Sequence, residues 1–226
     1  MFLSGAWIEE NGGKFIFPFK AELIDCSSYT MRIGSEVYVS PDAKDRRDAT
    51  LLQLDHEQEI SVPPGQFSFL ISREHLNIPI DLMAFINLRT KLKSQGLINV
   101  SGFHVDPGYN GRLIFSVFNA GVKTVKMRAD DPVLLIWFAR LEMPDPRFSK
   151  QGKPGHKKIS SDMMASLPSE GASIGSVSAR LDKVETELRT YKWIASIIVT
   201  LVVSVLASYP IWSSDAESTA SVEIER

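Results

Sequence analysis

The sequence predicts a mainly β domain followed by a coiled-coil helix and one transmembrane helix. Three features of the chain support this prediction. Short apolar runs separated by Pro, Gly and Asp fill its first part, a spacing typical of β barrels and sandwiches. Apolar residues at helical spacings of three and four come next, and twenty residues without a charge follow them. The predicted parts are a domain over residues 1–142, a linker over 143–173, a coiled coil over 174–192, a transmembrane helix over 193–212 and a polar tail over 213–226.

The domain is expected to contain a series of short strands. Each candidate is an apolar run rich in β-branched or aromatic residues and bounded by turn residues. Residues 74–82 are expected to form a loop, and residues 91–95 a helical turn. The last strand, VLLIWFARL, is expected to be buried on both faces, with Trp137 and Phe138 in core or subunit-interface packing rather than in a base-stacking platform. The expected strands are residues 15–19, 31–39, 51–54, 66–71, 83–88, 112–119, 122–127 and 133–141.

Composition narrows the functional classes. The formal net charge of −2 gives no sign of a nucleic-acid-binding protein, so no nucleic-acid partner is expected. The single cysteine, Cys26, excludes an internal disulfide and a multi-cysteine zinc site, and it is expected to be a small buried hydrophobe. The four histidines lack metal-ligand spacing, and no protein-bound metal is expected. His104 stands two residues before Asp106, where a ligand contact and a structural role are both open.

The turn DPGYNG over residues 106–111 is the strongest local signal in the domain. Pro107 restricts φ, and the two glycines permit positive φ and a close approach of the backbone to a ligand. The Asp106 carboxylate can accept a hydrogen bond from a ligand hydroxyl. A strand follows immediately, so the turn is expected to form the mouth of a ligand site.

The residues on both sides of this turn resemble the dCTP deaminase/dUTPase family. The similarity extends in order over about residues 1–142. It implies a dUTPase-like β-barrel or jelly roll, and a homotrimer whose subunits share sites at their interfaces. The segments that carry the resemblance are MFLS over 1–4, IFPF over 16–19, SYTMRIG over 28–34, residues 64–82, LRTKLKSQGL over 88–97, VDPGYNG over 105–111 and FSVFN over 115–119.

The resemblance implies a nucleotide site. Charged and hydroxyl side chains after strand 83–88 are expected to hold a triphosphate through charge-assisted hydrogen bonds. A triphosphate is expected to bring Mg²⁺, because Mg²⁺ is usually held through phosphates rather than by a protein cage. The implied nucleotide-binding residues are Arg89, Thr90, Lys91, Asp106, Tyr109, Ser116 and Asn119.

The resemblance fails at the position that carries deamination. Ser116 stands where deaminases of this family have the glutamate that shuttles protons, and a serine hydroxyl is not a usable acid or base near neutral pH. The loss of one such group costs about 10²–10⁴ in rate. No catalytic residue is therefore assigned, except Asp106 if the site works as in dUTPases, where this residue holds the deoxyribose and activates water. Further departures are Thr30 for an aspartate, Leu88 for a glycine, Lys91 for a serine and Ser94 for an arginine.

The sequence therefore favours a membrane-anchored dCTP deaminase-like protein that binds a (deoxy)nucleotide. In this interpretation it is a pseudoenzyme, a sensor or effector with little or no deaminase activity. The alternative is an active membrane-tethered dCTP deaminase or dUTP diphosphatase. Enzyme activity is thus left open at this stage.

Two basic segments also have alternative interpretations. Arg46 and Arg47 lie in the charged run 40–48, which is either a solvated loop or a phosphate contact. RFSKQGKP over residues 147–154 resembles the family tail that closes over bound nucleotide. The alternative is a basic segment attracted to anionic lipid headgroups.

The last part of the chain predicts a helix that enters a membrane. Leu at two a positions and Val at two d positions of the apolar stripe favour a trimeric or higher coiled coil; a single amphipathic helix is the alternative. The run 193–212 is about 30 Å long as a helix, the thickness of the hydrocarbon core. Arg189 and Lys192 precede it, so the positive-inside rule predicts a single-pass protein whose N-terminal domain is cytoplasmic. The stripe consists of Ile174, Val177, Leu181, Val184, Leu188 and Tyr191, and the expected interfacial anchors are Trp193, Tyr209 and Trp212.

Overall fold

The computed structural model describes residues 1–40, 51–55, 58–165 and 174–208. The chain divides into two units, Met1–Val177 and Ser178–Arg226. Two predicted segments lie outside the described residues: the charged run with Arg46 and Arg47, interpreted as a solvated loop or a phosphate contact, and the tail 213–226. The same holds for the side chains of α4 before Lys183, which include half of the predicted coiled-coil stripe.

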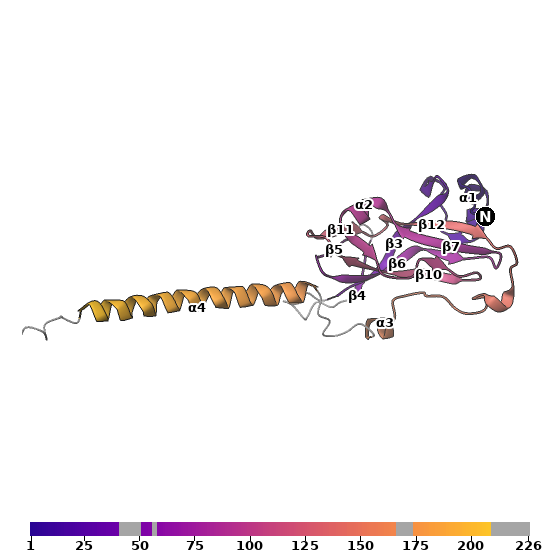
Figure 1. The fold of residues 1–226 in the computed structure, drawn as a ribbon. Coiled ribbons are helices and arrows are strands. Elements are labelled where there is room, and N and C mark those ends of the chain that lie inside the picture. The colour runs from indigo at the N-terminus through magenta and orange to yellow at the C-terminus, as the bar shows by residue number, and fades with distance from the viewer. Residues whose placement is uncertain (41–50, 56–57, 166–173, 209–226) are drawn as a thin grey trace, which may run out of the picture. The chain divides into compact units, whose positions relative to one another are not determined.

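The first unit is built on one curled antiparallel sheet (Figure 1). Its main path runs in the order β8-β10-β6-β3-β12-β7-β9, and β1, β2 and β4 pair with strands of that path. A separate pair, β11 with β5, covers one end. The strands are β1 Ile16–Phe17, β2 Ile24–Asp25, β3 Ser28–Val39, β4 Leu51–Gln53, β5 Glu59–Val62, β6 Phe67–Asn77, β7 Leu82–Leu88, β8 Leu97–Asn99, β9 His104–Val105, β10 Asn110–Asn119, β11 Val125–Arg128 and β12 Pro132–Arg140.

Short helices and turns close this unit. Helix α1 begins after Ser4, whose hydroxyl accepts a hydrogen bond from the backbone N–H of Trp7 and so caps the helix. The predicted helical turn at 91–95 is confirmed as α2. The helical segments are α1 Gly5–Asn11, η1 Gly12–Lys14, η2 Ala21–Leu23, α2 Thr90–Ser94, η3 Pro146–Phe148, α3 Ser161–Ala165 and α4 Ile174–Ser208.

The predicted mainly β barrel is confirmed, with corrections at individual elements. The loop expected over 74–82 is wrong in its first half, because β6 continues to Asn77. Glu74 interrupted the apolar pattern of this strand, but its carboxylate is fully buried against Arg32 of β3. The strand expected over 15–19 is reduced to β1, since Pro18 has no N–H for a ladder. Helix α1 and the short strands β5, β8 and β9 were not predicted.

The core lies inside the curled sheet. Residues such as Met31 and Ile33 of β3 are fully buried in this core, and the first half of β3 is buried throughout. Burial alternates along the second half of β12: Ile136 and Phe138 are buried, whereas Trp137 is only half-buried. The expectation that this strand is buried on both faces is therefore wrong within one chain, and Trp137 lies on the outer face.

Cys26 also differs from its prediction. Its side chain is exposed, and its φ is +54° in the turn between β2 and β3. That left-handed conformation closes the hairpin at the surface, where a thiol cannot pack into the core. A short turn that demands an unusual φ has overridden the preference of cysteine for the interior.

The second unit consists mainly of helix α4. The helix is continuous through the predicted coiled coil and into the predicted transmembrane run. Its segment Lys183–Ala207 is long and apolar enough to cross a membrane. The boundary expected at residue 192 is thus a change in composition and not a break in the helix.

Candidate functional site

The first group of predicted site residues lies where β7 ends and α2 begins. The backbone N–H of Arg89 donates to the carbonyl of Val133 at 3.0 Å, which fastens this corner to β12. Leu92 anchors the short helix in the core, while Thr90 and Lys91 are exposed. Among the described residues, the side chains of Arg89 and Lys91 form no ion pair. This corner, called the α2 end below, presents two cations and a hydroxyl to solvent.

The second group lies at the predicted turn, which the structure confirms between β9 and β10. Gly108 has a φ of +73°, as the turn requires. Both carboxylate oxygens of Asp106 face nitrogen atoms of other side chains: His104 Nε2 lies 3.5 Å from Oδ1, and Lys150 Nζ lies 3.6 Å from Oδ2. Asp106 is half-exposed, so these pairs are screened by water. The structure thus adds Lys150 to the residues around Asp106.

Tyr109 fixes the turn to its surroundings. Its hydroxyl donates to the carbonyl of Arg112 at 2.6 Å and accepts from the backbone N–H of His156 at 3.4 Å. Burial raises the pKa of Tyr109 above its usual range, and the hydrogen bond from His156 only partly opposes this. The phenol therefore remains protonated and keeps its donor role near neutral pH.

Ser116 and Asn119 both lie on β10 but in different settings. Ser116 is buried opposite Phe69 of β6, and no described residue hydrogen-bonds its hydroxyl. Asn119 is fully buried, and its amide nitrogen donates to the carbonyls of Val62 and Lys123 at 2.7 and 2.9 Å. Its side-chain oxygen accepts from the N–H of Gly121. Asn119 thus holds the loop after β10 in place, and its predicted contact with nucleotide would use only its remaining acceptor capacity.

One chain does not bring the two groups together. The pairing of β7 with β9 places Ala84 opposite Val105, so Asp106 follows near the beginning of β7. Arg89 follows the last residue of β7. Because a strand rises about 3.3 Å per residue, these two side chains start about 20 Å apart along the sheet. Within one chain, Arg89 and Asp106 therefore lie toward opposite ends of β7.

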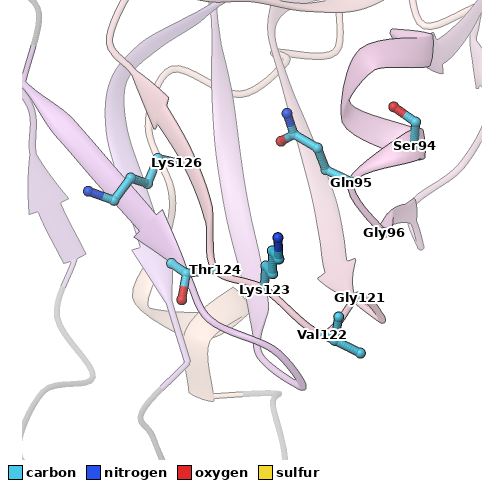
Figure 2. Close-up of a pocket in the computed structure, with 8 residues that line it drawn as sticks. All are labelled: Ser94, Gln95, Gly96, Gly121, Val122, Lys123, Thr124 and Lys126. Atoms are coloured by element: carbon cyan, nitrogen blue, oxygen red, sulfur yellow. The ribbon is translucent and has the colours of Figure 1, made fainter.

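Two hollows in this unit lie apart from the predicted residues. The first has a volume of about 690 Å³ and lies beyond α2, between that helix and the loop after β10 (Figure 2). Figure 2 shows Lys123 and Gln95 on opposite sides of this space. The second, about 550 Å³, lies between β7, α2 and β8. Lysine and amide side chains line both hollows, but none of the seven predicted nucleotide-binding residues does.

Comparison with known proteins decides the family. A family profile described as dCTP deaminase-like matches residues 2–141. The chain belongs to the dCTP deaminase-like family. It is 26% identical over 144 residues to a dCTP deaminase of Pyrococcus abyssi, covering 64% of this chain and 88% of that protein. It is 31% identical over 129 residues to a dCTP deaminase of Thermococcus kodakarensis, covering 57% and 77%.

A solved structure shows the same fold. The crystal structure of 2'-deoxycytidine 5'-triphosphate deaminase from Agrobacterium tumefaciens aligns with a TM-score of 0.51 at 16% identity. The alignment covers 62% of this chain and 48% of that chain, so this dCTP deaminase-like chain spans about half the length of that protein. The family predicted from the sequence motifs is therefore confirmed.

Two features near the predicted residues were missed from the sequence. The first is the Arg32–Glu74 pair: the Arg32 Nε atom lies 2.7 Å from one carboxylate oxygen, and its backbone N–H donates to the other at 2.8 Å. Burial raises the pKa of Glu74, and the hydrogen bonds and charge of Arg32 oppose that rise. The second is the contact of Lys150 with Asp106. A charged residue inside an apolar run was the available signal for the pair, while no local pattern could reveal the contact.

Proposed function

We propose that this chain is a membrane-anchored, homotrimeric dCTP deaminase-like protein that binds a (deoxy)nucleotide as a sensor or effector. The separation of Arg89 from Asp106 along β7 is the observation that carries the proposal. The α2 end of one copy supplies cations for phosphates, and the turn of another supplies Asp106 and Tyr109. Such a site exists only in the assembled protein.

The exposed surface of the barrel supports assembly. Ile98, Val100 and Phe103 are at least half exposed, next to the edge strands β8 and β9. Phe85 lies in ring contact with both Phe103 and Phe2. A cluster of large exposed apolar side chains at a sheet edge favours association with another protein surface. Copies of the same chain are the simplest partners, because the shared site already requires them.

The replacement at position 116 supports binding without efficient deamination. The Ser116 hydroxyl is buried and cannot carry the proton that deamination moves. Arg89, Thr90 and Lys91 remain suited to a triphosphate. Asp106 is a single carboxylate that already faces Lys150 and His104, so Mg²⁺ would be held mainly through the phosphates.

Helix α4 supports the anchoring. Its apolar segment has the length of a bilayer core, and Arg189 and Lys192 lie on the side of the barrel domain. By the positive-inside rule, the chain crosses once, with the barrel domain in the cytoplasm. The heptad stripe before the span matches a trimeric barrel.

The alternative function is an active membrane-tethered enzyme, either a dCTP deaminase or a dUTP diphosphatase. The specific observation in favour of diphosphatase activity is the retained Asp106 with His104 beside it. That pair could orient and activate a water. The deaminase alternative has no comparable support at Ser116.

Mixed trimers test the shared site directly. Full-length protein in detergent is titrated with Mg²⁺-dCTP and Mg²⁺-dUTP, with Arg89→Ala and Asp106→Asn as separate variants. Each variant alone is expected to lose binding. Co-expression of the two in equal amounts restores about a quarter of the sites, since that share pairs an intact α2 end with an intact turn. No recovery on mixing would contradict a site shared between copies.

Turnover assays separate the two functions. Wild-type protein is expected to bind nucleotide but to release neither dUTP from dCTP nor pyrophosphate from dUTP. Ser116→Glu tests whether the lost proton carrier alone blocks deamination. Measurable turnover by the wild type would overturn the sensor proposal in favour of the enzyme.

A further inference from the structure

Residues 146–164, called the strap, connect the barrel to helix α4 and lie against the predicted turn. Figure 1 shows the chain leaving β12 and passing β10 on its way to α3. The N–H of Lys150 donates to the carbonyl of Pro107, and the N–H of Gly155 to the carbonyl of Asn110, both at 2.8 Å. The N–H of Arg112 donates to the carbonyl of His156 at 2.7 Å. Main-chain hydrogen bonds thus fasten the strap to the turn and the start of β10.

Glycines make this contact closer than side chains would allow. A Cβ on Gly155 would lie 2.5 Å from the carbonyl oxygen of Asn110, and one on Gly111 would lie 2.7 Å from the backbone of Gly155. A Cβ on Gly108 would lie 2.7 Å from the backbone nitrogen of Gln151. The turn and the strap are therefore packed backbone to backbone. This close packing is a second observation, separate from the hydrogen bonds, and it shows that the strap and the turn fit each other closely.

The far end of the strap is anchored in a second apolar cluster. Ile159 is buried against Tyr38 and Ile71 on the outer face of the sheet. Its backbone N–H donates to Glu36 Oε2 at 2.7 Å. A buried isoleucine contributes more to stability than an exposed ion pair does. The strap therefore has a strong anchor at Ile159 and a weaker, charge-dependent contact at Lys150.

The charge-dependent contact involves Asp106, the residue that the proposed ligand also contacts. Lys150 Nζ lies 3.6 Å from Asp106 Oδ2, with both side chains about half-exposed. A ligand hydroxyl that donates to this carboxylate oxygen competes with Lys150 for it. This competition can change the ligand affinity by no more than the strength of the exposed ion pair. That strength is about 0.4 to 1 kcal/mol, which corresponds to a factor of two to five in affinity.

We propose that the strap is an autoinhibitory element that competes with ligand for Asp106. Ligand at the turn loosens the Lys150 segment of the strap, and a docked strap weakens ligand binding by the same factor.

Amide hydrogen exchange of the full-length protein in detergent tests the docking itself, without any ligand. Asp106→Asn is expected to raise exchange at Lys150 and Gly155 by two- to five-fold, and Gly155→Ala to raise it more. Gly102→Ala is the matched control, because nothing lies within 4 Å of the added Cβ. Exchange at these amides that stays at the wild-type rate in both variants would overturn the proposed contact, whether or not nucleotide binds.

The coupling rests on the proposed nucleotide binding and is tested with Mg²⁺-dCTP and Mg²⁺-dUTP as probes. Lys150→Gln is expected to tighten binding two- to five-fold, and bound nucleotide to raise exchange at Gly155. Weaker binding by Lys150→Gln would overturn the proposal, because Lys150 would then hold the phosphates as part of a lid. If neither probe binds the wild type, the proposed function fails, while the exchange result for Asp106→Asn still decides the strap contact.

Discussion

The two ends of β7 differ in what surrounds their functional side chains. At the α2 end, Arg89 and Lys91 face solvent with no ion pair among the described residues. At the turn, Asp106 lies between His104 and Lys150, and the strap packs on the backbone. The comparison teaches that the end proposed to hold phosphates is open, whereas the end with Asp106 is covered by the strap. Phosphate binding and coupling to the strap are therefore expected to reside at different ends.

The largest expected effect on stability comes from the buried pair of Arg32 and Glu74, which joins β3 to β6. Glu74→Ala leaves Arg32 buried without its carboxylate and is expected to lower the free energy of unfolding by about 3 to 5 kcal/mol. Since β3 and β6 support both ends, hydrogen exchange should rise at both together. Urea titration of the full-length protein measures the loss. Glu59→Ala, which breaks the exposed pair with Lys126, is the control and should leave the midpoint near that of the wild type. Equal midpoints for the two variants would contradict a structural role for the buried pair.

The loss of stability at high pH tests the same part of the sheet through Tyr29 of β3. Burial, with the nearby charge of Glu74, raises the pKa of Tyr29 from 10.0 to about 12. The unfolded chain therefore loses this proton at lower pH than the folded chain, so stability falls as pH rises from 10 to 12. The loss is roughly 2 to 3 kcal/mol. Urea titrations at pH 9 and pH 12 should show a smaller loss for Tyr29→Phe than for the wild type, and an identical loss would refute the shifted pKa.

The open end is tested by Arg89→Ala. Removing a charged donor to phosphate should weaken Mg²⁺-dCTP binding by about 1.5 to 3 kcal/mol, or at least ten-fold. Stability should hardly change, because the side chain has no partner among the described residues. Arg128→Ala, which removes an exposed arginine from β11, is the matched control for net charge. An equal loss of affinity in this control would mean that only the overall charge matters.

Substitution at the covered end, the turn, is expected to have the smallest effect. It should lower stability rather than weaken phosphate binding. Tyr109→Phe removes the hydroxyl that joins Arg112 to His156 and should cost about 1 kcal/mol. Exchange at the His156 amide should increase several-fold. Tyr38→Phe is the matched control, since the ring contacts are kept and no described residue hydrogen-bonds its hydroxyl. An unchanged His156 amide in Tyr109→Phe would show that the phenol does not secure the strap.

The structure also shows where local patterns suffice and where they fail. The DPGYNG turn and strand β10 were predictable because Pro and Gly restrict backbone geometry within a few residues. The end of β6 was not predictable, because a glutamate such as Glu74 indicates a loop unless its buried partner Arg32 on β3 is known. The prediction that Cys26 is buried failed for a local reason. The geometry of the hairpin at this one position outweighed the general preference of cysteine for burial.

The sequence by itself determined the family, the mainly β class, the turn at Asp106 and the helix long enough to cross a membrane. These depend on motif order, short-range periodicity and run length, all of which are local properties of the chain. Only the tertiary structure decided that Arg89 and Asp106 lie at opposite ends of β7 and that Lys150 reaches Asp106. Contacts of this kind join residues that are far apart in the chain, and strand pairing and packing determine them through the whole sheet at once.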